Sequence, residues 1–131
     1  MGGVRNIGDS SGYSPEYRAT ATPAADFPAL KATLAERRMA PADWAAQLRA
    51  MMSHDVGRAN GGSLDRAASR VTAKALVVVA AQDHMVNPLP ALEFAPKIHA
   101  RVVELTGNCG HMATSCEAAK LGPAVKAFLG E

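Results

Sequence analysis

Two side chains of this sequence have the types and positions that acid–base chemistry needs. Asp83 follows the apolar run at residues 75–81, and His111 follows a second short run at residues 101–106. Side chains placed directly after the strands of a parallel sheet gather at its carboxyl edge, where ligands and catalytic groups lie. There a carboxylate can fix the tautomer of an imidazole, and the imidazole can take the proton of a nucleophile. The simpler interpretation is that Asp83 caps a helix and that His111 is an ordinary loop histidine.

The segments that must position these side chains form a β-α-β-α pattern. Residues 75–81 carry consecutive β-branched and leucine side chains, which is typical of a strand buried on both faces. A helical pattern over about residues 90–99 leads to a second strand at residues 101–106, so a right-handed parallel crossover is expected. A closing helix is expected over about residues 115–129. The predicted fold class is α/β. Since two parallel strands leave both sheet edges open, this half looks like the end of a longer sheet whose earlier strands are not in this chain.

Helical segments are expected before the first strand. The spacing of apolar residues predicts three of them, over about residues 27–37, 41–54 and 64–70. The second carries large apolar side chains along one face, namely Trp44, Leu48, Met51 and Met52. This stripe is most simply part of the core, and the alternative is a wall against which an acyl chain binds.

The sequence divides into three parts. Residues 1–22 are rich in Gly, Ser, Thr and Pro and are expected to be irregular. Residues 23–72 are expected to be a helical, lid-like region, and residues 73–131 hold the β-α-β-α pattern. Pro96 and Pro123 fall inside two of the expected helices, where an interior proline costs about 3 kcal/mol.

The composition is that of a globular chain, with 131 residues, 48% hydrophobic and 20% charged. The net charge of +2 comes from scattered Lys and Arg, which does not favour a nucleic-acid partner. No apolar stretch is long enough to span a membrane, and residues 1–20 lack the apolar core of a signal peptide. Two cysteines, Cys109 and Cys116, are too few for a disulfide framework. A cytoplasmic location is therefore expected, with Cys109 as a buried thiol rather than a nucleophile.

Several stretches resemble the last third of homoserine O-acetyltransferase-like proteins, which are acyltransferases of the α/β-hydrolase fold. The resemblance covers roughly residues 40–129, and its most specific parts are residues 76–88 and the segment Cys109-Gly-His111. It implies a Ser-His-Asp triad in which Asp83 is the acid and His111 the base. It also implies acetyl-CoA or another acyl-CoA as co-substrate, no bound cofactor or metal, and a place in methionine biosynthesis.

The nucleophile of such a triad is hard to find. The family carries it on a Gly-x-Ser-x-Gly turn between a strand and a helix. Gly8-Asp9-Ser10-Ser11-Gly12 has this letter pattern, but no apolar strand precedes it and Pro15 follows closely. Too few residues separate Ser10 from Asp83 for the usual strands and lid, so a flexible turn is the preferred interpretation. Met112 stands where family acetyltransferases tend to carry an acidic residue, which leaves the acceptor substrate open.

Three functions are therefore predicted as alternatives. The first is the C-terminal part of an acyltransferase that moves an acyl group from a thioester to a hydroxyl and is inactive alone. The second is part of an esterase, with water as the acceptor. The third is a non-catalytic module that pairs, through its open sheet edge, with itself or with a separately encoded N-terminal half.

Overall fold

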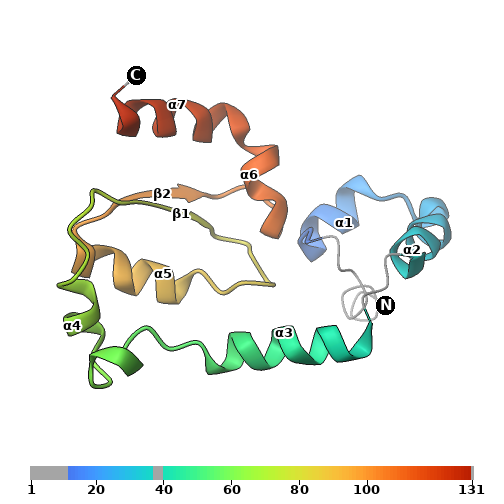
Figure 1. The fold of residues 1–131 in the computed structure, drawn as a ribbon. Coiled ribbons are helices and arrows are strands. Elements are labelled where there is room, and N and C mark those ends of the chain that lie inside the picture. The colour runs from blue at the N-terminus through green and yellow to red at the C-terminus, as the bar shows by residue number, and fades with distance from the viewer. Residues whose placement is uncertain (1–11, 37–39, 131) are drawn as a thin grey trace.

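The computed structural model describes residues 12–36 and 40–130 (Figure 1). At its centre are two parallel strands, β1 (Leu76–Ala80) and β2 (Arg101–Leu105), paired in register along their whole length. This confirms both predicted strands and their parallel order. Because parallel strands end at the same edge, the loops that follow β1 and β2 start side by side.

Helices cover the two faces of this sheet (Figure 1). The crossover consists of α5 (Leu89–Phe94) and a 3-10 segment (Ala95–Ile98), and α5 contacts β1. After the single turn α6 (Ala113–Cys116), the closing helix α7 (Ala118–Leu129) lies on the opposite face and contacts β2. The predicted β-α-β-α order is confirmed, and the chain is a mixed arrangement of helices around a short parallel sheet.

The two helical prolines have different surroundings. Pro96 lies in the first turn of the 3-10 segment, where a missing N–H leaves no helical hydrogen bond broken. The chain changes from α to 3-10 geometry there, so the expected interior defect is absent. Pro123 lies inside α7, as the sequence predicted.

The N-terminal part contains a helix that the sequence analysis missed. Helix α1 (Pro15–Ala21) begins after Ser14, whose Oγ accepts a hydrogen bond of 3.1 Å from the amide of Tyr17. A serine cap followed by proline at the first helical position is a helix-start signal. The prediction of an irregular segment over residues 1–22 is therefore wrong for most of its described residues.

The three helices expected before the first strand are confirmed. They are α2 (Phe27–Glu36), α3 (Pro41–Ser53) and α4 (Leu64–Ala68). Helix α4 starts as predicted, because Ser63 Oγ accepts a hydrogen bond of 3.2 Å from the amide of Arg66. In the described residues, no helix combines the length and the apolarity that crossing a membrane requires.

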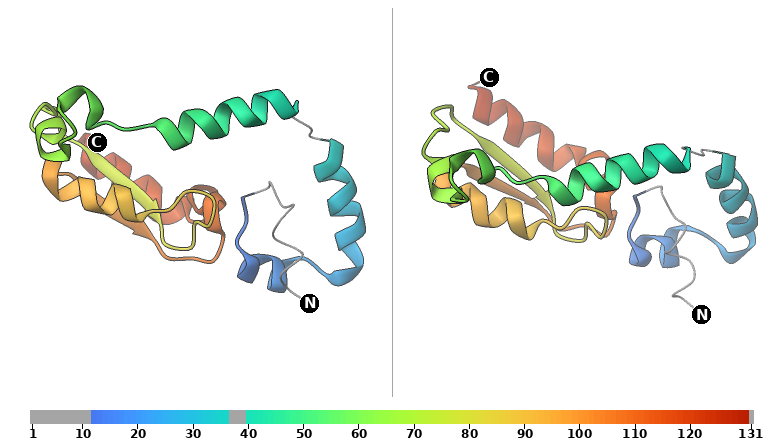
Figure 2. Two further views of the ribbon diagram at one scale, coloured as in Figure 1. Left: turned by 90° about the horizontal axis from the view of Figure 1, so that it is seen from below. Right: turned by 60° about the horizontal axis from the view of Figure 1, so that its bottom comes forward.

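Helix α3 is largely uncovered. Helices α3 and α2 lead away from the sheet, and α1 returns to the loop that follows β2 (Figure 2). Along α3, Trp44 is 44% exposed and Met52 is 86% exposed. The prediction that the apolar stripe belongs to the core is wrong, because no other element of the described chain packs closely on this helix.

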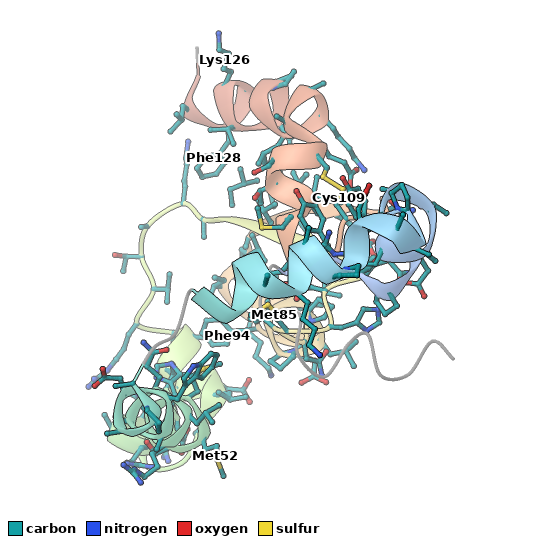
Figure 3. The ribbon with its side chains drawn as sticks, turned by 90° about the vertical axis from the view of Figure 1, so that its right-hand side faces the viewer. Met52, Met85, Phe94, Cys109, Lys126 and Phe128 are labelled. Carbon is teal, nitrogen blue, oxygen red and sulfur yellow. A yellow bond between two sulfur atoms is a disulfide. The ribbon has the colours of Figure 1, made fainter. Side chains whose placement is uncertain are left out.

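The buried core lies under the loop that follows β2. Its centre is Leu105, Cys109 and Ala113, all almost fully buried. Around this centre pack partly buried side chains from α1, both strands and α7, including Tyr13, Tyr17, Val78, Val103 and Leu121. Figure 3 shows Cys109 where α1 meets the C-terminal helices. The loop that carries His111 is thus attached to the best-packed part of the molecule.

Candidate active site

Asp83 and His111 are in contact at the carboxyl edge of the sheet. Nδ1 of His111 lies 2.8 Å from Oδ2 of Asp83. Asp83 is in the loop after β1, and His111 is in a 3-10 turn (Gly110–Met112) after β2. The parallel register of the strands brings the two loops together, as the sequence predicted. The catalytic role of the pair stays a prediction.

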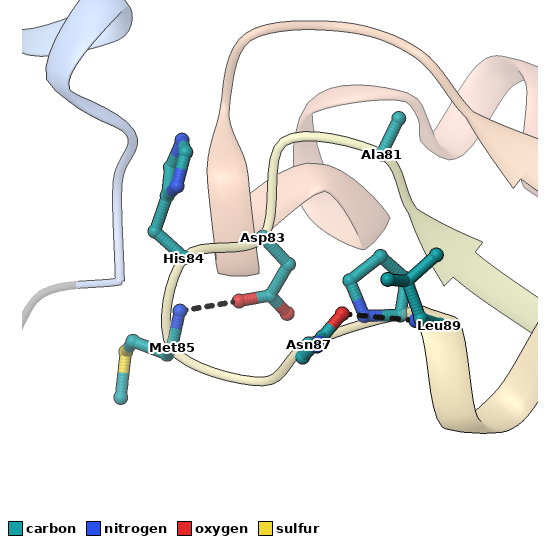
Figure 4. Close-up of a pocket in the computed structure, with 7 residues that line it drawn as sticks. Ala81, Asp83, His84, Met85, Asn87 and Leu89 are labelled. Carbon is teal, nitrogen blue, oxygen red and sulfur yellow. Dashed lines mark hydrogen bonds between the residues drawn. The ribbon is translucent and has the colours of Figure 1, made fainter.

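The loop after β1 fixes the carboxylate of Asp83. Its Oδ1 accepts hydrogen bonds of 2.9 Å from the amides of Met85 and Val86, which leaves Oδ2 for His111. In Figure 4 this carboxylate points toward the amide of Met85, whereas the ring of His84 points away from it. One oxygen of Asp83 therefore closes a turn within the loop and the other holds the imidazole. The alternative that Asp83 caps a helix is wrong, because α5 begins only at Leu89.

These surroundings lower the pKa of the Asp83 carboxyl below its ordinary value. Burial acts in the opposite direction and raises the pKa, but the amide of Val86, the imidazole of His111 and the amide of Met85 outweigh it. The carboxyl is thus ionised at neutral pH. Because the folded state lowers this pKa, the ionised carboxylate stabilises the folded chain. The stabilisation is fully present above the ordinary carboxyl pKa of 3.8 and is lost as the pH falls through the lower pKa of the folded state.

The second nitrogen of His111 is open to a reacting group. Because a carboxylate only accepts hydrogen bonds, Nδ1 carries the proton and donates it, and Nε2 of the neutral ring carries a lone pair. The side chain of His111 is 44% exposed, and no donor or acceptor among the described residues contacts Nε2. An imidazole held in this way can accept a proton from a group that approaches Nε2.

The segment at residues 12–14 supports the loop that carries His111. Ser14 Oγ donates a hydrogen bond to the carbonyl oxygen of Asn108. Gly110 has a φ of +63° and lies so close that a Cβ there would be 2.6 Å from the backbone nitrogen of Ser14. A Cβ on Gly12 would be 3.1 Å from Cβ of His111. Sequence reasoning missed this support, although the helix-start signal at Ser14 was present.

Cys109 and Cys116 form a disulfide across the same loop (Figure 3). This corrects the prediction of a free buried thiol at Cys109 and leaves no thiol there to act as a nucleophile. The two cysteines are seven positions apart, and the 3-10 turn followed by α6 brings their Cα atoms to 6.4 Å, within the range of a disulfide. The bond encloses His111 in a small covalent ring.

A pocket of about 500 Å³ opens to solvent beside Asp83 (Figure 4). It is lined by residues of the loop after β1, namely Ala81, Asp83, His84, Met85, Asn87, Pro88 and Leu89. Asn87 Oδ1 accepts a hydrogen bond of 3.0 Å from the amide of Leu89, the first residue of α5. The volume is that of a small-molecule site, and the lining combines apolar with polar side chains.

The described residues place no candidate nucleophile beside His111. Ser10 is outside the described residues. Ser14 is buried, and its hydroxyl is engaged with Asn108 and with the amide of Tyr17. No hydroxyl or thiol in the described parts of the chain is hydrogen-bonded to His111. Nor do those parts hold a group of three or more His, Cys, Asp or Glu side chains arranged to bind a metal.

No protein-family model, curated protein or solved structure matches this chain. The class that the structure defines is therefore one of architecture: helices on both faces of a short parallel sheet, with an aspartate–histidine pair at its carboxyl edge.

Proposed function

We propose that Asp83 and His111 are the acid and the base of an acyl-transfer site of the α/β-hydrolase type, in the C-terminal part of a homoserine O-acetyltransferase-like enzyme. The hydrogen bond of 2.8 Å between His111 Nδ1 and Asp83 Oδ2 carries this proposal. The order of acid and then histidine along the chain, each after a parallel strand, agrees with it.

In the proposed reaction, His111 moves protons and Asp83 holds the imidazole. Nε2 of His111 takes the proton of a serine hydroxyl while the serine oxygen attacks the carbonyl carbon of an acyl thioester such as an acyl-CoA. The thiolate leaves and receives that proton. His111 then takes the proton of an acceptor hydroxyl, whose oxygen attacks the acyl-serine. The bond between the acyl carbon and the serine oxygen breaks, and the imidazolium gives its proton to that oxygen. The charge on Asp83 stabilises the imidazolium that forms in each half of the reaction.

We propose that the serine comes from a chain segment outside the described residues, such as an N-terminal half with its own strands. The sheet gives such a segment a place to pair, because each strand has only one partner among the described residues. The uncovered apolar stripe of α3 offers further surface for it. Among the residues that the structure describes, the pair has no hydroxyl or thiol to activate.

The chain alone is therefore expected to show no acyl transfer from acetyl-CoA to homoserine and no hydrolysis of p-nitrophenyl acetate above the rate of its His111→Ala variant. Product analysis by mass spectrometry and release of nitrophenolate measure the two reactions. His54→Ala is the matched control, because His54 is exposed and, within the described parts of the chain, paired with no carboxylate. Turnover that His111→Ala and Ser10→Ala both abolish, and His54→Ala keeps, would make Ser10 the nucleophile and refute the missing segment.

The base is tested separately with diethyl pyrocarbonate, which modifies unprotonated imidazole nitrogens. At pH 8 we expect Asp83→Asn to slow the modification of His111 severalfold, since the carboxylate fixes the tautomer in which Nε2 carries the lone pair. His54 is the internal control and should react equally in both proteins. Equal rates at His111 would mean that Asp83 does not act on the imidazole, and the acyl-transfer proposal would fail.

A further inference from the structure

We propose that the Cys109–Cys116 disulfide is a redox-dependent clamp that holds His111 against Asp83. With the bond closed, the imidazole is kept at the carboxyl edge of the sheet. With two free thiols, the turn that carries His111 loosens and the pair opens. Its meaning as regulation of acyl transfer rests on the function proposed above, whereas the movement of His111 does not.

The position of the bond is the first argument. The disulfide joins the residue two positions before His111 to the residue five positions after it. The ring that it closes contains only the 3-10 turn at Gly110–Met112 and the four residues of α6. Helical segments this short are marginally stable by themselves. The covalent bond is therefore a constraint on the direction of the imidazole, in addition to the packing of the turn against residues 12–14.

The remaining contacts of the loop lie at its ends and within its turn. Ser14 holds the carbonyl of Asn108, before the ring begins. Glu117, directly after the ring, accepts a hydrogen bond of 2.8 Å from the amide of Gly107. Between these anchors, the turn keeps two internal hydrogen bonds, one of 3.3 Å from the amide of Met112 to Cys109 O and one from the amide of Ala113 to Gly110 O. Gly110 also lies against Ser14, and Ala113 is fully buried. Opening the disulfide would remove the covalent restraint on the segment that bears His111 and leave it held by these two hydrogen bonds and by its packing.

The accessibility of the two cysteines favours reversible exchange. Cys116 is exposed, whereas Cys109 is only 6% exposed. A thiolate of an external dithiol would attack Sγ of Cys116, and Sγ of Cys109 would leave as a thiolate and take up a proton. The second thiol of the dithiol then attacks the mixed disulfide and releases Cys116 as a thiol. The protein gains two electrons and two protons, and the dithiol becomes a disulfide.

A disulfide of this kind fits a switch better than a permanent staple. The bond spans a short local loop with one exposed cysteine and does not link distant parts of the chain. Where disulfides occur in a reducing cytoplasm, they are usually transient, catalytic or redox-sensing. The cytoplasmic location stays a prediction, and the proposed clamp requires only that the protein meets both thiol and disulfide reagents.

Carbon-13 NMR of the labelled full chain, oxidised and then reduced with dithiothreitol, tests the clamp. The side-chain carboxyl signal of Asp83 is followed against pH in both states. We expect reduction to raise the pKa of Asp83, because the hydrogen bond and the positive charge of His111 both lower it in the closed form. The Cys109→Ser, Cys116→Ser double variant should show the higher pKa with or without dithiothreitol.

Two comparisons make the result specific. In His111→Asn, reduction should no longer change the titration of Asp83. The carboxyl signal of Asp65, which is paired with Lys97 elsewhere in the fold, should not respond to reduction. An Asp83 titration that is identical in both states would overturn the clamp, and so would a shift of Asp65 together with Asp83, because that would mean global unfolding. If the pKa of Asp83 in oxidised His111→Asn equals that of the oxidised wild type, the pair itself is absent, and it is the proposed function that fails.

Discussion

Replacing Gly110 by alanine is expected to lower the free energy of unfolding by about 3 kcal/mol. The φ of +63° accounts for about 1–2 kcal/mol of this loss, because an L-residue is strained in the left-handed region. The remainder comes from overpacking, since the new Cβ would lie 2.6 Å from the nitrogen of Ser14 and 2.9 Å from the carbonyl oxygen of Gly12. Both are backbone atoms, so no side-chain rotation relieves the contact.

The matched control is Gly62→Ala, measured by denaturant unfolding followed by circular dichroism. Gly62 has a φ of +75° with no heavy atom within 4 Å of the added Cβ. It should therefore lose only the conformational part, about 1 kcal/mol. Equal destabilisation of the two variants would contradict the contact between residues 12–14 and the loop that carries His111.

Replacing Leu105 by alanine is expected to lower the free energy of unfolding by about 3 kcal/mol. Leu105 is fully buried at the end of β2, and partly buried side chains from both strands, α1 and α7 pack around it. Truncation removes this apolar contact and leaves a cavity directly beneath the loop that holds Cys109. Because a small domain has a total stability of only about 5–15 kcal/mol, the loss would be a large fraction of the whole.

The control for Leu105 is Leu129→Ala at the end of α7, where the leucine is 63% exposed and about 0.5 kcal/mol is expected. If the alanine variant does not fold, Leu105→Val can be measured in its place, with an expected loss of about 1 kcal/mol in the free energy of unfolding. Losses at Leu105 no larger than at Leu129 would show that the core is not centred under the His111 loop.

The sequence predicted the parts of the fold that depend on local patterns. The apolar run at residues 75–81 predicted β1, because so many apolar side chains in a row are unusual at a surface. The connection to the second strand is long enough for a crossover, which predicted that the two strands are parallel. The prediction that Asp83 and His111 lie close together followed from this order, because the residues that follow two parallel strands lie at the same edge of the sheet. The start of α4 was equally local, since Ser63 caps it.

The parts that sequence reasoning missed depend on distant partners. The contact between Ser14 and Asn108 joins residues 94 positions apart, and no local pattern records such a contact. The disulfide depended on the loop geometry that brings Cys109 and Cys116 together. The stripe that includes Trp44 and Met52 has the spacing of a buried face, but burial requires something to cover it, and the described chain provides no cover.

Proton NMR of the oxidised protein tests the hydrogen bond between Asp83 and His111 most directly, and the proposed chemistry depends on that bond. We predict a strongly downfield Nδ1–H resonance assigned to His111, present in the wild type and in His54→Ala and lost in Asp83→Ala. A spectrum without this resonance, or one in which it survives the removal of the Asp83 carboxylate, would show that the two side chains are not a pair.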